Sequence, residues 1–225
     1  MTQQRGPVRE QPLTKGTSET TSWELARERL ADPEYQRTSW LATTRPDGRP
    51  HLMPVITTWI DDAIHLIVGE GTRKGRNLAA DGRCVVATSS TTLPSIDLVL
   101  EGRLEPVTDA DAVRDLAEVY TKSGWPLEAK GDKVDGPNAP TAGPPPYTIF
   151  RIVPSKVFGL PGMYGMDEFD PSDLPRPTRW DFVSGRPRGD RADRRSGRIR
   201  GGRALSRMGS ALIATSDDRH PCAAG

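Results

Sequence analysis

The sequence lacks the features that would place the protein in a membrane, in an oxidising compartment or around a metal. No apolar run approaches the roughly 20 residues that cross a bilayer, and the polar N-terminus has no hydrophobic segment of the signal-peptide kind. Cys84 and Cys222 are too few for a disulfide framework, and three scattered histidines add no metal cluster. The sequence therefore predicts a cytoplasmic protein without a metal site or membrane contact.

Apolar residues are also scarce. Only 35% of the residues are hydrophobic, whereas Gly and Pro number 22 and 21, so much of the chain is expected to be loop or disordered. The net charge of +1 is unevenly distributed, because residues 183–225 carry +6 and the remainder −5. A mildly acidic domain of this kind is not expected to bind nucleic acid through its fold.

These shifts in composition predict three parts: a disordered arm over residues 1–20, a folded domain over 21–182 and an Arg/Gly-rich disordered tail over 183–225. The tail holds eight arginines between Arg186 and Arg203 and shows little periodicity. Three interpretations of it remain open: a solubilising tail, an RNA-binding tail, or out-of-frame sequence from a GC-rich genome.

The chain is organised around residues 39–80. Alternating apolar residues predict three strands, at 39–44, 51–60 and 64–68, joined by turn-forming residues at 45–48 and 61–62. Thr72 is a helix N-cap residue type and begins a predicted helix over 72–80. Arg73 and Lys74 lie in its first turn, where the helix dipole disfavours cations. A bound phosphate would resolve that conflict, and a solvated basic turn is the alternative.

Several motifs resemble those of the pyridoxamine 5′-phosphate oxidase-like split-barrel family. They follow the family order within about residues 23–182 and read DGRPH at 47–51, TRKGRNL at 72–78, DLVLEG at 97–102 and TRWDF at 178–182. The resemblance implies a mainly β protein with flanking helices, built as an antiparallel split β-barrel. It also implies a homodimer with two cofactor sites at the subunit interface. The short spacing of about six expected strands is consistent with a small antiparallel barrel.

The same resemblance implies a flavin or deazaflavin cofactor, FMN or F420, in a reductase that acts on an unknown small molecule. The cofactor phosphate would contact Thr72, Arg73 and Lys74, while Asn77 would fix the loop or reach the phosphate. The ring system would lie against five residues of the second and third strands: Met53, Pro54, Val55, Ile67 and Val68. No catalytic side chain is predicted, and the family's pyridoxal-phosphate signature is not recognisable.

A composition typical of high-GC sources favours F420, whose acidic tail Arg45, Arg49 and Arg76 could contact. FMN needs only the phosphate site. Two other classes remain open: a non-catalytic FMN-, F420- or haem-binding module of the same fold, and an interaction protein whose tail is the active part.

The remaining expectations concern packing. Thr21 and Glu24 form a capping box for a helix, and Trp23 and Trp40 are expected to be core or lid anchors. Cys84 is expected in the core. Pro54 predicts an edge or a bulge in its strand, and Gly102 predicts a bulge. His51 is expected to be a surface or phosphate-side histidine, with a functional base as the alternative. A helix is expected over 109–122, capped by Thr108. Residues 125–146 are expected to be a lid or disordered, 147–157 a strand, and 158–182 an irregular wrap.

Overall fold

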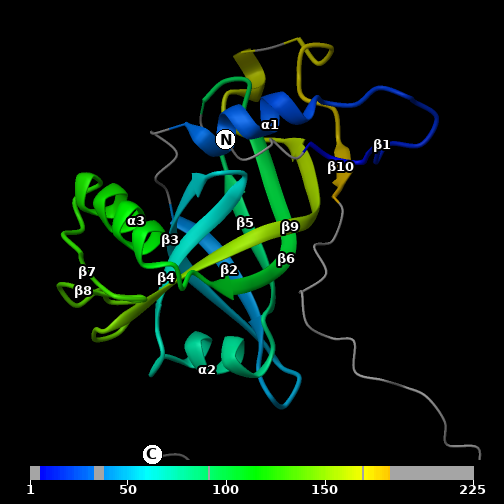
Figure 1. The fold of residues 1–225 in the computed structure, drawn as a ribbon. Helices are drawn as coiled ribbons and strands as arrows, with labels where there is room; N and C mark the ends of the chain where they lie inside the picture. The colour runs from blue at the N-terminus through cyan, green and yellow to red at the C-terminus, as the bar shows by residue number, and fades with distance from the viewer. Residues whose placement is uncertain (1–5, 33–37, 91, 169, 183–225) are drawn as a thin grey trace, which may run out of the picture. The chain divides into compact units, whose positions relative to one another are not determined.

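Six antiparallel strands form a closed barrel (Figure 1). The computed structural model describes residues 6–32, 38–90, 92–168 and 170–182. The barrel strands are β2 (Thr38–Thr44), β3 (Pro50–Ile60), β4 (Ala63–Gly69), β5 (Arg83–Ser89), β6 (Ile96–Pro106) and β9 (Tyr147–Pro161). They pair in the order β9-β4-β3-β2-β5-β6, and β6 pairs again with β9 to close the ring. The predicted mainly β architecture, an antiparallel barrel with flanking helices, is confirmed.

Shorter elements surround the barrel. β1 (Arg9–Pro12) pairs with β10 (Thr178–Asp181), which pairs with β9. β7 (Glu128–Lys130) and β8 (Lys133–Asp135) form a hairpin that joins β9. The helices are α1 (Trp23–Ala31), α2 (Arg73–Ala80), α3 (Ala110–Lys122) and the short 3-10 helix η2 (Met166–Glu168). Within the described residues, none of these helices has the length and apolar character needed to cross a membrane.

β3 and β4 separate partway along their length. Their ladder runs from Ile60 and Ala63 to Thr57 and Leu66, and no further pair joins them in the described chain. Residues 50–56 of β3 pair only with β2, and residues 67–69 of β4 pair only with β9. Pro54, which lacks a backbone N–H, therefore lies at an edge as predicted. We call this gap in the β3–β4 ladder the opening; it extends to Gly69, where β4 ends before α2.

Two apolar cores hold these elements together. The barrel interior is filled by side chains that are 0% exposed, among them Leu66, Val68, Val86, Leu98 and Leu100. A second core lies between α3 and the outer side of β4 and β9, with Ile67, Ile149, Val113, Leu116, Ala117 and Tyr120. The four buried residues of α3 repeat at helical spacing, so this helix packs on the barrel through one apolar face. Cys84 lies in the barrel core, where burial raises the pKa of its thiol to about 12.

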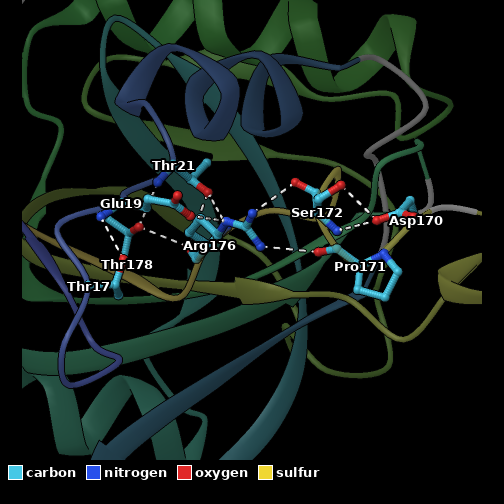
Figure 2. A network of polar contacts seen from close by, with 8 residues as sticks. All are labelled: Thr17, Glu19, Thr21, Asp170, Pro171, Ser172, Arg176 and Thr178. Carbon is cyan, nitrogen blue, oxygen red and sulfur yellow. Dashed lines mark hydrogen bonds and ion pairs between the residues drawn. The ribbon is translucent and has the colours of Figure 1, made fainter.

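Two of the three predicted N-caps, those of α1 and α3, are wrong by one residue. Ser22, rather than Thr21, caps α1 by accepting a hydrogen bond from the Leu25 N–H at 3.3 Å. Asp109, rather than Thr108, caps α3. Thr21 is used instead in a polar network between residues 17–21 and 170–178 (Figure 2), where its N–H donates to Thr178 Oγ1 at 2.8 Å. A long-range contact thus determines which of two adjacent hydroxyl residues caps the helix.

Arg176 is the centre of that network, as Figure 2 shows. Its guanidinium pairs with Glu19 at 2.9 Å and donates to the carbonyls of Pro171 and Ser172 at 3.1 and 2.9 Å. Its backbone N–H also donates to Thr21 Oγ1 at 2.6 Å. The network joins the segment before α1 to the segment before β10.

Three segments that were expected to be irregular contain strands. β1 falls within the predicted arm over residues 1–20, of which residues 1–5 lie outside the described residues. The β7–β8 hairpin lies within 125–146, and β9 and β10 occupy parts of 158–182. β1, β8 and β10 are paired by partners distant in sequence, so local polarity hid them, whereas β7 pairs with the adjacent β8. The predicted tail over 183–225 lies outside the described residues.

The outer face of β2 and β3 exposes large apolar side chains. Trp40, Leu52 and Ile56 are 48%, 57% and 50% exposed. Trp23 is a core residue as predicted, but Trp40 is not, because strand alternation directs its neighbour Leu41 into the barrel instead. The predicted bulge at Gly102 is confirmed by a register shift between β6 and β9.

Candidate functional site

The first turn of α2 follows the end of β4 after a tight turn. Thr72 Oγ1 accepts a hydrogen bond from the Gly75 N–H at 3.1 Å and donates to the Gly69 carbonyl at 2.7 Å. The predicted cap at Thr72 is therefore confirmed. The N–H groups of Arg73 and Lys74 have no hydrogen-bond partner among the described residues. They are the donors that a helix N-terminus offers to an anion.

Gly75 lets this turn approach the helix closely. A Cβ at position 75 would lie 2.6 Å from the Gly69 carbonyl oxygen and 2.8 Å from that of Glu70. Both neighbours are backbone atoms and cannot move aside as a flexible side chain can. The position therefore requires glycine because a side chain would not fit. Its backbone conformation is helical and would by itself accept other residues.

Lys74 is buried, with only 2% of its surface exposed. Its ammonium donates to the backbone carbonyl of Thr141, which lies in the segment between β8 and β9. Burial lowers the pKa of Lys74. No carboxylate within the described part of the chain forms an ion pair with this ammonium. Two of its three N–H donors are left without a partner among the described residues.

Asn77 anchors α2 to the barrel. It is 1% exposed, and its Nδ2 donates to Thr43 Oγ1 of β2 at 3.0 Å. Its Oδ1 is buried and has no partner in the described chain. Thr43 pairs with His51 across the β2–β3 ladder. The Nδ2 contact ties α2 to β2, and the two roles predicted for Asn77, fixing the loop or reaching the phosphate, stay predictions.

Four basic side chains gather where α2 meets the β2–β3 turn, and we call Arg45, His51, Arg73 and Lys74 the basic cluster. The pKa of His51 is lowered, first by partial burial and then by the charges of the three other members. Arg45 Nε is buried without a partner within the described residues. Three cations that repel one another create a favourable position for an anion.

The other two arginines that were candidates for an acidic ligand make contacts within the chain. Arg49 Nε and Nη2 both donate to Asp47 Oδ2, at 2.9 and 2.6 Å, and these bonds lower the pKa of that carboxyl. Arg76 donates to the Gly71 carbonyl at 2.7 Å. Of the three, Arg45 alone belongs to the basic cluster.

The five predicted ring-contact residues border the opening between β3 and β4. Met53 and Pro54 are half-buried, whereas Val55, Ile67 and Val68 are 4%, 5% and 0% exposed. The side chains of these three residues belong to the two cores. A planar ligand could therefore reach their backbone edges, which lack a β3–β4 ladder, and the side chains of Met53 and Pro54.

Sequence reasoning missed the parts of the site that come from distant segments. The pairing of Thr43 with His51, and of Asn77 with Thr43, brings the DGRPH turn beside the TRKGRNL helix. The presence of a basic residue in each motif was the available signal. Among the described residues, no group of three or more acidic, histidine or cysteine side chains could hold a metal.

The chain belongs to the pyridoxamine 5′-phosphate oxidase family, whose sequence model matches residues 25–160, more than half of its length. The match covers the whole basic cluster and five of the six barrel strands completely. No curated protein matches the chain.

Solved structures with a similar fold include an F420 reductase, 22% identical over 58% of this chain and 94% of that one, with a TM-score of 0.41. A FAD-binding protein from Mesorhizobium loti is 19% identical over 63% and 93%, with a TM-score of 0.44. A pyridoxamine 5′-phosphate oxidase-related, FMN-binding protein from Nostoc punctiforme is 17% identical over 63% and 83%, with a TM-score of 0.43. Membership of the family rests on its sequence model rather than on these distant likenesses.

Proposed function

We propose that the protein binds FMN or F420 and acts in the cytoplasm as a flavin- or deazaflavin-dependent oxidoreductase on a small molecule. The observation that carries this proposal is the basic cluster at the end of the β3–β4 opening. Arg45, Arg73 and Lys74 take part in none of the ion pairs formed among the described residues. A phosphate fits this charge, and the free N–H groups of α2 supply donors for its oxygens.

Each residue of the site has a distinct part. Arg73 and Lys74 would bind the phosphate, while Thr72 holds the helix start and Asn77 fixes α2 to β2. Lys74 can keep its bond to Thr141 and still offer two donors to phosphate. A bound flavin or deazaflavin supplies the redox chemistry, and the protein supplies orientation and electrostatics. No side chain of the chain is assigned a catalytic role.

The exposed outer face of β2 and β3 favours a homodimer. Trp40, Leu52 and Ile56 present apolar surface beside the edge at Pro54. A single barrel offers a ligand only one wall at the opening, whereas ligand sites usually bury most of the ligand. A second copy with two-fold symmetry would cover the apolar face and provide the other wall.

The cofactor is identified by titrating the purified protein separately with FMN, F420 and haem while recording absorption and fluorescence. We expect saturable binding of FMN or F420, and F420 is the first to test because the composition is typical of high-GC sources. A Soret band with haem alone would instead support a haem module. A protein that binds none of the three would contradict the proposal.

Reductase activity requires a separate assay. The protein loaded with the cofactor it binds should oxidise or reduce that cofactor when offered a panel of small electron acceptors, such as quinones and nitroaromatics. Cofactor binding without turnover on any substrate would indicate a non-catalytic cofactor-binding module instead of a reductase.

A further inference from the structure

β8 and the segment between β8 and β9 make three polar contacts with residues 69–74, which run from the end of β4 into the first turn of α2. Lys133 Nζ lies 2.6 Å from Glu70 Oε1. The Gly69 N–H donates to the Ala142 carbonyl at 3.0 Å, and the Lys74 ammonium donates to the Thr141 carbonyl. We call residues 133–143 the clamp, since these contacts come from both of its ends.

Lys133 connects the turn before α2 to the barrel itself. Besides Glu70, its ammonium contacts Thr148 Oγ1 of β9 at 2.7 Å. Thr148 is buried and pairs with Val68 of β4, so Lys133 bridges the turn and the strand beneath it. The bonds from Lys133 also lower the pKa of Glu70. This side chain therefore holds Glu70 at a fixed place beside the first turn of α2.

The far end of the clamp fits closely against the helix cap. Gly143 has a φ of +79°, and a Cβ there would lie 2.9 Å from Thr72 Cγ2. A Cβ at Gly69 would collide with the Ala142 carbonyl oxygen. Neither glycine can gain a side chain without separating the clamp from the turn, so the two segments are positioned by each other.

We propose that the clamp positions the phosphate-binding turn of α2, with Lys133 as its main positioning residue. The proposal rests on the proposed function, because the clamp acts on the site where the phosphate would bind. With the clamp in place, the Gly69–Thr72 turn is tied down and Lys74 is held facing Thr141. Release of the clamp would let the Gly69–Thr72 turn and the Lys74 ammonium move, and an anion would then bind more weakly to both.

The first test compares Lys133→Met with Lys130→Met. Lys130 is the matched control because, in the described part of the chain, its ion pairs are with Glu128 and Asp135 of the same hairpin. Lys133→Met should weaken the binding of FMN, or of F420 if that is the cofactor, by roughly 3- to 10-fold, and Lys130→Met should leave it unchanged. Lys133→Arg should restore most of the affinity, since it keeps a cation within reach of Glu70.

The second test uses glycines of equal backbone strain. Gly143→Ala should weaken cofactor binding because the new Cβ meets Thr72. Gly131→Ala is the control, since Gly131 also has a positive φ of +66° but no atom within 4 Å of the added Cβ. Equal losses of affinity in the two alanine variants would show that backbone strain, rather than contact with the cap, is responsible.

Hydrogen exchange separates failure of the clamp from failure of the proposed function. In the cofactor-free protein, Lys133→Met should speed exchange of the amides of residues 69–76 at unchanged overall stability, and Lys130→Met should not. This result would support the clamp even if the parent bound neither FMN nor F420. If both Lys133→Met and Gly143→Ala leave the exchange rates and the cofactor affinity unchanged, the proposed role of the clamp is wrong.

Discussion

The two ends of the barrel differ in what they do with polar and charged groups. α1 and α2 lie at opposite ends of the barrel in Figure 1. At the α1 end, Trp23 packs against Trp180 and Phe182, with ring centroids 5.5 and 4.8 Å apart. At the α2 end, the basic cluster brings together cations that form no ion pair within the described chain.

Charges near the α1 end are matched within the protein. Arg27 pairs with Asp62 at 3.3 Å, Arg29 donates to the Leu93 carbonyl at 3.1 Å, and Arg176 has the network of Figure 2. The contrast shows that the unpaired cations near α2 are not a general property of this arginine-rich chain. Unfavourable electrostatics kept at one place are typical of a binding site, since a ligand can relieve them.

The largest effect should come from Trp180→Ala at the α1 end. Trp180 is 0% exposed, and its loss should lower the free energy of unfolding by about 3–5 kcal/mol through cavity formation. Denaturant unfolding measures this change. The affinity of the remaining folded protein for FMN or F420 should stay within about 2-fold of the parent. A large loss of affinity at retained fold would show that the two ends are coupled.

The buried histidine His65 should make the stability of the protein depend on pH. Burial lowers the pKa of His65 to about 4, so between pH 6.5 and about 4 the unfolded chain binds the extra proton and the folded chain does not. Stability is therefore complete above about pH 6.5 and falls, by roughly 3 kcal/mol, as the pH approaches 4. His65→Leu should remove most of this dependence in pH-dependent urea unfolding; an unchanged slope would contradict the assignment.

A bound phosphate should raise the pKa of the other described histidine, His51. Because the cations of the basic cluster help to lower the pKa of His51, an added anion should raise it, and the pKa of His65 should not respond. NMR titration of the imidazole signals with and without FMN or F420 measures both, with His51→Gln as the assignment control. Equal shifts at both histidines would argue against a local anion site.

A smaller effect is expected for the network of Figure 2. Arg176→Met removes the pair with Glu19 and two bonds to carbonyls, which should cost about 1–2 kcal/mol of stability. Arg114→Met is the control, because among the described residues Arg114 pairs with exposed Asp111 and Asp115 of its own helix. This substitution should cost less than about 0.5 kcal/mol of stability. Thermal unfolding of both variants decides whether the network stabilises the fold.

The sequence predicted best what local chemistry determines. β4 and α3 were expected close to their observed bounds, because their periodicities come from adjacent residues. Thr21 and Trp40 were misjudged for a common reason. A hydroxyl can cap a helix or join a tertiary network, and a tryptophan can face either side of a strand. Thr178, 157 residues away, determines the outcome for Thr21, whereas Trp40 lies on the outer face because the adjacent Leu41 points into the barrel.

The site residues divide in the same way, into those that local sequence indicates and those that depend on distant contacts. Thr72, Arg73 and Lys74 could be chosen from the sequence because a cap and two cations at a helix start are a local conflict. The place of His51 in the basic cluster depends on the β2–β3 register. The role proposed for Lys133 depends on its contact with Glu70, which lies 63 residues earlier in the chain. No pattern in the sequence indicates the second of these, since Lys133 lies in a loop-like stretch of glycines and prolines.

The central claim, that the α2 end binds a cofactor phosphate, is tested most directly by titrating FMN and F420 into Lys74→Met and Arg49→Met. Lys74→Met should weaken binding by about 1.5–3 kcal/mol, the range for hydrogen bonds to charged groups, and a cooperative thermal unfolding transition should show that the variant remains folded although its bond to Thr141 is lost. Arg49→Met removes an exposed cation that is already paired with Asp47 and should change affinity little. Parent affinity in Lys74→Met, measured by isothermal titration calorimetry, would contradict the account.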